Sequence, residues 1–285
     1  MKHPCLLALC SLLGLGLSAC GGDSIPDPGL RTDDAQTVDP NRLLVTLRGK
    51  AELFPEAAQR LAAQGQPLPS LEGLSLVIEE PLRAGVNDPA ASFGTGVCAE
   101  DGTFSITDVP VKDIHTSLAA SLEHPGLAHT STIVFDTAFT GSRPRTDITG
   151  AQAWALPLSF QDALTQSVGE EAIGAHTEGR ARSLLDAGFI LGRVVDAQGR
   201  PVAGARVQIE PGELADRLYY PSDDFTRADQ DGTHGHGLFL YVHSGLGAEA
   251  FQLAVHGSEA YTWRNAGAMP HRGLVLTLHP GDRAP

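Results

Sequence analysis

The residues best suited to chemistry lie between positions 219 and 243, where histidine, aromatic and acidic side chains are concentrated. Neutral imidazoles bind zinc and copper well. His234 and His236 would share one side of an extended segment, but His243 comes seven residues after His236 and would face the other side. Gly235 and Gly237 also favour a loop. We therefore expect a solvated loop with incidental histidines, without a metal or other cofactor.

Two further patterns resemble metal-ligand pairs. Asp229 and Asp231 before Gly232 resemble the start of a calcium loop, but the remaining acidic ligands and the closing Glu of an EF-hand are missing. An Asp-Gly turn explains them more simply. His256 and Glu259 have a spacing similar to the H-x-x-E pair of zinc carboxypeptidases, but no catalytic domain surrounds them. Neither pattern predicts a metal site.

Aromatic rings in the same stretch are candidates for ligand contacts, because binding sites are often lined by such side chains. At least half of these rings are expected in a protein core instead. An envelope polysaccharide is the ligand class that such rings would suit. The candidate ligand-binding loop comprises Tyr219, Tyr220, Phe225, His234 and His236, with Tyr261 as a further stacking ring.

Catalytic signatures are missing from the chain after position 20. It holds no G-x-S-x-G elbow, P-loop or dinucleotide-binding fingerprint. We therefore assign no catalytic residue and expect a protein that is not an enzyme. A metal-dependent hydrolase built on the loop from His234 to His243 is the enzymatic alternative.

The clearest structural pattern lies in residues 189–210. Apolar residues give way at Asp196 to a turn with Gly199 and Pro201, and alternation then resumes with Val207 and Ile209 on one face. This order predicts a hairpin of two strands. The spacing G-x-V-x-D-x-x-G-x-P-x-x-G-A-x-V resembles the opening of carboxypeptidase regulatory-like domains. That resemblance implies a non-catalytic, transthyretin-like β-sandwich over residues 189–280, related to carbohydrate-binding modules.

An N-terminal sandwich is also expected, in residues 43–140. Apolar and polar residues alternate there in several short runs, the pattern of half-buried strands. Glu79-Glu80-Pro81 weakly parallels Glu210-Pro211 at the end of a strand. Residues 141–188 are expected to form a partly helical linker, with helices near Ser159 and over 178–187, and residues 281–285 a tail. The predicted fold class is all-β, with tandem transthyretin-like sandwiches. The alternating runs cover residues 43–48, 74–79, 104–107, 118–122 and 133–135.

The first residues have the layout of a secretory signal, with a basic start and an apolar run too short to span a bilayer. The sequence Leu17-Ser18-Ala19-Cys20 resembles a bacterial lipobox. That resemblance implies a signal peptide over 1–19 and acyl chains such as palmitate on Cys20, which anchor durably in a membrane. Gly21 after the cysteine is similar to sorting signals for the outer membrane. Residues 20–42, with three Pro and five Asp, predict a flexible tether.

Charge and cysteine content limit the partners. The formal net charge is -14, and without a basic cluster nucleic acid is excluded as an expected partner. Once the signal is removed and Cys20 is acylated, Cys98 remains without a disulfide partner and is expected to be a small buried residue. The leading hypothesis is therefore a membrane-anchored envelope lipoprotein that acts as a binding or structural module, with an envelope protein or polysaccharide as partner.

Overall fold

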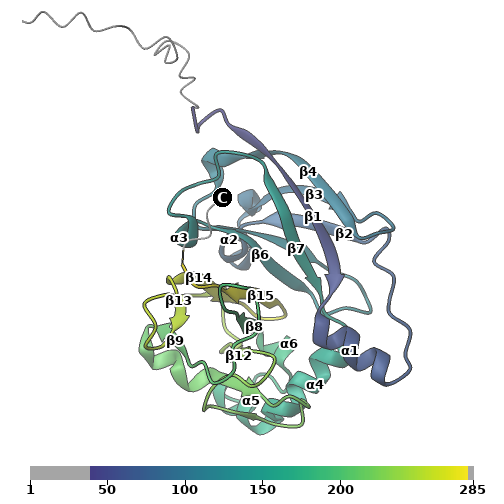
Figure 1. Cartoon of the computed structure of the whole chain (residues 1–285), viewed down its shortest axis with the longest axis vertical. Helices are drawn as coiled ribbons and strands as arrows, with labels where there is room; N and C mark the ends of the chain where they lie inside the picture. The colour runs from purple at the N-terminus through teal and green to yellow at the C-terminus, as the bar shows by residue number, and fades with distance from the viewer. Residues whose placement is uncertain (1–38, 282–285) are drawn as a thin grey trace, which may run out of the picture. The chain divides into compact units, whose positions relative to one another are not determined.

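A nine-stranded mixed sheet runs through residues 39–281, the part of the chain that the computed structural model describes (Figure 1). Strands from both halves of the chain contribute to this sheet, so it forms one wall of each of two hydrophobic cores. In order across the sheet the strands are β11 (Ala228–Asp229), β10 (Leu218–Pro221), β12 (Leu238–Val242), β8 (Phe189–Val194), β15 (Gly273–Leu278), β6 (Thr130–Asp136), β5 (Ser117–Leu122), β2 (Ser75–Glu79) and β3 (Ser92–Val97).

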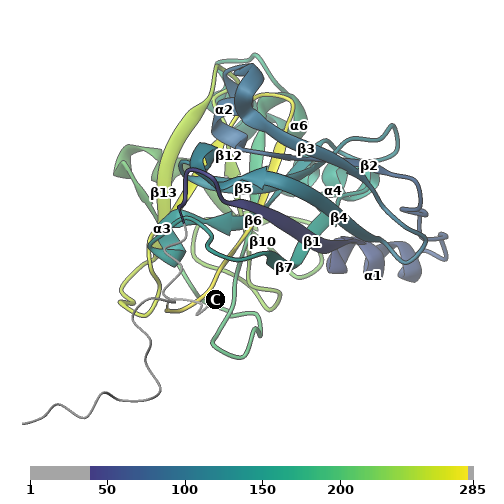
Figure 2. The same ribbon diagram turned by 90° about the horizontal axis from the view of Figure 1, so that it is seen from above.

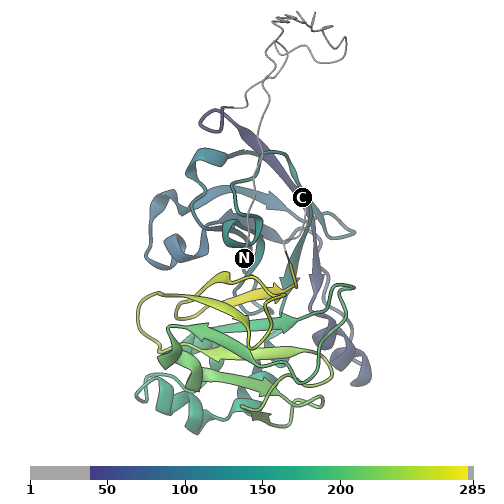
Figure 3. The ribbon, with the colours of Figure 1, turned by 60° about the vertical axis from the view of Figure 1, so that its left-hand side comes forward.

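Two three-stranded sheets pack on the long sheet and complete two sandwiches, which Figure 3 separates by colour, purple to teal and green to yellow. The first small sheet has the order β4 (Thr103–Pro110), β1 (Leu44–Leu53), β7 (Ile148–Ala155). The second has the order β14 (Arg264–Ala268), β13 (Glu249–Val255), β9 (Val207–Glu210). The expected all-β class with sandwich architecture is confirmed.

Alternating residues fill the two cores as the sequence predicts. Leu47 of β1 and Leu76 of β2 are fully buried in the first core, and Ile209 of β9 is buried in the second. Burying each such side chain contributes roughly 1.5–3 kcal/mol. Cys98 also lies in the first core, with 2% of its surface exposed, which confirms its expected role as a small buried residue.

Helices cover the outer face of the long sheet in the second half of the chain. Phe160, Leu164 and Leu184 pack there against Phe189 and Leu191. Both faces of β8 are therefore buried, which explains its continuous apolar sequence. The helices around this third cluster are α1 (Pro55–Ala63), α4 (Leu158–Val168), α5 (Glu170–His176) and α6 (Leu184–Ala187), all labelled in Figure 1. Figure 2 shows α1, α4 and α6 from above.

The helix bounds in residues 141–188 differ from those expected. Helix α4 starts at Leu158 after Pro157, so Ser159 lies inside it and is not its cap. The helix expected over 178–187 is shorter, because Glu178 and Gly179 adopt positive φ angles. Its last part is α6, whose first turn is capped by the hydroxyl of Ser183. Strand β7 and helix α5 in this stretch have weak apolar periodicity and were not expected.

The predicted hairpin over 189–210 is wrong in its pairing. Strand β8 pairs with β12 and β15, whereas β9 pairs with β13 in the opposite sheet. The turn itself is as tight as expected, since the Asp196 carboxylate accepts the backbone N–H of Arg200 at 2.9 Å. The chain pairs only at Val195 and Pro201 and then crosses to the other sheet. Alternation gives the face of each strand but not its partner.

Short helical turns follow several strands. None of the helices in residues 39–281 is long and apolar enough to cross a membrane. Cys20, the signal and most of the tether lie outside the described residues. The short elements are α2 (Pro81–Gly85), η2 (Pro89–Ala91), η3 (Val111–Asp113), α3 (Thr137–Thr140) and η4 (Gly212–Arg217).

A close approach at Gly192 predicts a strong effect of one methyl group. A Cβ atom at this position of β8 would overlap the ring of Phe239 on the neighbouring strand. We expect Gly192→Ala to lower the free energy of unfolding by about 2 kcal/mol, measured by urea denaturation. Gly174→Ala in α5 is the control, since nothing lies within 4 Å of its Cβ position and alanine should stabilise the helix by up to about 1 kcal/mol. Equal effects of the two substitutions would contradict this packing.

Candidate functional site

The two tyrosines of the expected ligand-binding loop point to opposite faces of β10, as neighbouring strand residues must. Tyr220 is buried in the second core, and its hydroxyl accepts the backbone N–H of Val207 at 2.8 Å. Tyr219 lies on the helical side, with its hydroxyl 2.7 Å from Nε2 of His176. Burial raises the pKa of both hydroxyls. Both side chains are therefore engaged inside the fold.

Phe225 and His236 form a packed turn, where a solvated loop was expected. Their rings stack with centroids 5.1 Å apart and an angle of 11° between planes, and Phe225 also meets the edge of Phe160. Nε2 of His236 lies 3.3 Å from the carbonyl of Ser222, and burial lowers the pKa of this histidine. The expectation of a solvated loop was wrong because it rested on the glycine content of the segment. The ring of Phe225 packs against His236 and holds the turn in place.

The three histidines of this stretch do not converge. His234 lies 3.0 Å from the carboxylate of Asp229, and that carboxylate also accepts the backbone N–H of Asp231 at 3.1 Å, as in an Asp turn. His243 is fully buried against the carbonyl of Ala187. Within residues 39–281 no group of three His, Cys, Asp or Glu side chains is placed to hold a metal ion.

Tyr261 is engaged in the same way as the other rings. Its hydroxyl donates to the carbonyl of Val195 at 3.0 Å, and its ring is packed against the second core. The aromatic residues singled out for sugar stacking therefore all have internal contacts, and the geometry favours a packing role for them.

Buried carboxylates at the junction of the two sandwiches are the feature that sequence reasoning missed. Arg264 of β14 donates from Nε to the carboxylate of Asp136, at the end of β6, at 2.7 Å. Arg272, before β15, pairs with Glu79 at the end of β2. Each pair joins one residue of the first sandwich to one of the second, and the two carboxylates are less than 10% exposed. We call these two pairs the junction ion pairs.

Glu79 and Asp136 have partners beyond their arginines. Glu79 accepts hydrogen bonds from the hydroxyls of Ser121 and Ser131 on the adjoining strands. Asp136 caps α3 by accepting the backbone N–H of Ala138 at 2.8 Å. A buried carboxylate needs such additional donors, because a single ion pair rarely offsets the loss of hydration. These carboxylates thus fix local structure and the junction together.

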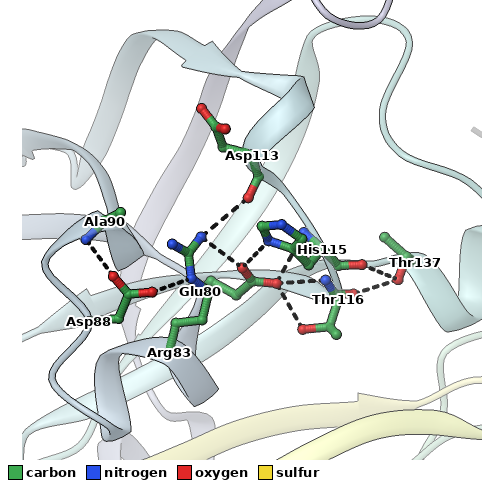
Figure 4. A network of polar contacts seen from close by, with 8 residues as sticks. All are labelled: Glu80, Arg83, Asp88, Ala90, Asp113, His115, Thr116 and Thr137. Carbon is green, nitrogen blue, oxygen red and sulfur yellow. Dashed lines mark hydrogen bonds and ion pairs between the residues drawn. The ribbon is translucent and has the colours of Figure 1, made fainter.

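Glu80 is the centre of a third polar network, in the first sandwich (Figure 4). Its carboxylate is fully buried. It accepts the backbone N–H of Thr116 at 2.6 Å and of His115 at 3.1 Å, and the Thr116 hydroxyl at 2.9 Å. Arg83 lies 3.4 Å from it and pairs at 2.8 Å with Asp88. Burial opposes ionisation, but these hydrogen bonds outweigh it, so the pKa of Glu80 lies below its usual value.

The local sequence explains why Glu80 reaches this place. Strand β2 ends at Glu79, and Pro81 starts α2, because proline suits the first position of a helix. Glu80 is thus held in the bend between strand and helix. Asp88 in turn caps η2 through the backbone N–H of Ala90 at 2.8 Å. Two acidic residues between an apolar strand and a proline are the signal that could have indicated buried charges.

Chemically, these networks are saturated. Each carboxylate is surrounded by donors from its own chain and so has little capacity left to accept hydrogen bonds from a ligand. A comparable pair lies on the helical side, where Arg193 of β8 pairs with Glu56 of α1 and covers the ring of Phe54 at 5.0 Å. The arrangement fixes the relative positions of strands and helices and assigns no reacting atom.

Comparisons with known proteins identify no family. No protein-family model and no curated protein matches the chain. Among solved structures, the shaft pilin SpaA of Lactobacillus rhamnosus GG is 10% identical, with 85% of this chain and 100% of that chain covered and a TM-score of 0.23. A DUF3823 family protein from Parabacteroides merdae ATCC 43184 is 11% identical, with coverages of 80% and 98% and a TM-score of 0.24.

The Bacillus anthracis TIE protein is 9% identical, with 85% of this chain covered and a TM-score of 0.21, and the chain spans 34% of its length. TM-scores in this range do not establish a shared topology. The description of the fold therefore rests on the strand order and pairing of the chain itself.

Removal of one junction arginine should show how much its ion pair contributes to the free energy of unfolding. Arg264→Met leaves Asp136 buried without its cation, and we expect a loss of about 3 kcal/mol in the free energy of unfolding by urea denaturation. The double variant Arg264→Met with Asp136→Asn should recover part of this loss. Arg48→Met is the control, because the pair with Asp147 is exposed and such pairs contribute little. A loss for Arg264→Met no larger than for the control would show that the junction pair is dispensable.

The lowered pKa of Glu80 predicts a pH-dependent contribution to stability. A carboxyl group whose pKa is lower in the folded state stabilises the protein above its unfolded pKa of about 4.3 and loses this effect as the pH falls through the folded value. Glu80→Gln should therefore cost about 2 kcal/mol at pH 7, and the difference from wild type should shrink on acidification. Urea denaturation between pH 3 and 7 measures it, with exposed Glu72→Gln as control. A pH-independent difference would contradict the assigned cause.

Proposed function

We propose that the protein is a lipid-anchored β-sandwich module of the bacterial cell envelope, with a structural or binding role and without catalysis. The observation that carries the proposal is the fusion of two sandwiches through one continuous sheet and the junction ion pairs. Such a body keeps a fixed shape, because separating its halves would expose sheet edges and leave buried charges unpaired.

The absence of catalysis is supported by how the candidate chemical groups are used. The histidines, tyrosines and buried carboxylates described above are held by backbone and side-chain partners within the fold. Catalytic groups need access to a substrate and a site where a reacting atom can lie near them. The packing of these side chains favours a structural use.

Anchoring at the membrane is supported by the sequence alone. The lipobox-like Leu17-Ser18-Ala19-Cys20 precedes a segment rich in proline and aspartate, and β1 begins at Leu44. A diacylated or triacylated cysteine holds a protein durably on a membrane. We place the module on the outer membrane on the strength of Gly21, with an envelope protein or polysaccharide as its partner.

Lipid labelling tests the anchor. Cells that express the full chain are grown with radiolabelled palmitate, and we expect the label on the wild-type protein and none on Cys20→Ala. Cys98→Ala is the matched control and should keep the full label, since that thiol is buried in the first core. Wild-type protein without label, or label retained on Cys20→Ala, would refute lipidation at this position.

A further inference from the structure

His243 carries the one buried side-chain nitrogen or oxygen atom of residues 39–281 that lacks a hydrogen-bond partner, its Nε2. The side chain is 0% exposed. Buried polar atoms are nearly always paired, because an unpaired one loses its hydration without compensation. This atom therefore needs a physical explanation, and the neighbours of the ring supply one.

Three groups surround the ring, and no neutral form of the imidazole satisfies them all. Nδ1 lies 2.8 Å from the carbonyl oxygen of Ala187, and the backbone N–H of Gly245 points to the same Nδ1 at 3.0 Å. Nε2 faces the carboxylate of Glu249 at 3.7 Å. A carbonyl requires a protonated Nδ1, whereas an amide N–H requires a lone pair there.

The two neutral tautomers each bring acceptors together. With the proton on Nδ1, the lone pair of Nε2 faces the Glu249 carboxylate. With the proton on Nε2, the lone pair of Nδ1 faces the Ala187 carbonyl. The protonated ring donates to both oxygens and loses only the contact with Gly245. The pocket is thus one proton short of satisfying both of its oxygen acceptors.

Charged groups on the surrounding elements bias this proton in both directions. Glu249 of β13 also accepts the hydroxyl of Tyr241 at 2.7 Å and pairs with Arg217 at the end of η4 at 3.2 Å. Arg180, in the loop after α5, lies beside Gly245. Asp186, which precedes Ala187 in α6, is exposed. Burial and, to a smaller extent, Arg217 lower the pKa of His243, against the opposing effects of Glu249 and the Ala187 carbonyl.

The element that can respond is the loop of residues 244–248. Gly245 and Gly247 both have positive φ angles, of 76° and 59°, which glycine adopts without strain. Leu246 between them is 55% exposed. The contact of the Gly245 N–H with His243 therefore ties a short, glycine-hinged loop to the buried ring.

We infer that His243 is a proton-operated latch on the loop of residues 244–248. In the neutral form that holds the loop, Nε2 carries the proton and the lone pair of Nδ1 accepts the N–H of Gly245. A proton taken from solvent onto Nδ1 turns that nitrogen into a donor to the Ala187 carbonyl and releases the N–H of Gly245, while the charged ring faces Glu249 through Nε2–H. The loop is held at neutral pH and loosened at acidic pH.

The test follows His243 and Gly245 in the full chain, purified in detergent, by NMR between pH 4 and 8. The ring nitrogens of His243 should show one titration step below the ordinary histidine range. In that step the hydrogen-exchange protection factor of the Gly245 amide should fall roughly fivefold, as expected for the loss of one hydrogen bond. A His243 ring that stays neutral until the protein unfolds, or a Gly245 protection factor that does not change with the step, would overturn the inference.

Two variants with opposite expected shifts strengthen the test. Glu249→Gln removes the carboxylate that attracts the proton, so the step should move to lower pH. Arg217→Met removes the opposing cation, so the step should move to higher pH, and it provides the answer if Glu249→Gln does not fold. His256→Gln, at an exposed histidine, should leave the step in place. A step that neither variant moves would show that Glu249 and Arg217 do not control the latch.

Discussion

The parallel pairing of β15 with β6 is the interaction on which the rest of the structure depends. Three residue pairs, from Gly273 with Thr130 to Val275 with Thr132, join strands of the two halves into one sheet. Without this pairing, β6 and β15 would each present an unpaired edge, and hydrogen-bonding groups of the backbone would lose their partners. The junction ion pairs lie at the same boundary and depend on this register, because Arg272 directly precedes Gly273.

The corners of the sandwiches are closed by side chains in place of further strands. In the first sandwich, the backbone N–H of Trp154 in β7 donates to the hydroxyl of Thr132, and the backbone carbonyl of Trp154 accepts the hydroxyl of Thr130. In the second, Arg264 donates to the carbonyl of Thr277 at 3.2 Å, and Tyr220 covers the N–H of Val207. Backbone groups satisfied in this way offer less opportunity for another chain to add a strand.

The sequence predicted the buried face of each strand better than the strand with which it pairs. Alternation placed Leu47, Leu76 and Ile209 in cores correctly, because burial of one side of a strand is a local property. It could not show that β8 and β9 belong to different sheets, since pairing depends on residues far away in the chain. Strands β3, β7 and β14, rich in glycine, alanine and polar residues, lacked the pattern altogether.

The partners of the buried charges could not be predicted, for a related reason. Glu79 and Glu80 are acidic, and such residues are mostly exposed unless paired. Their partners Arg272 and Thr116 come from distant positions, so no local window contains the pair. The prediction of a solvated histidine loop was wrong for the opposite reason, because a local feature was given too much weight. Gly235 and Gly237 suggested a loop in solvent, whereas Phe225 provides the ring on which His236 packs.

The position of β15 within the sheet also has a consequence for biogenesis. It follows every other strand of the described region in sequence, yet it lies between β8 and β6 and pairs in parallel with both. The halves therefore cannot close on each other until residues 273–278 have left the ribosome, and contacts so distant in sequence form slowly. The junction between the two sandwiches is therefore completed only after the last strand of the described region has been made.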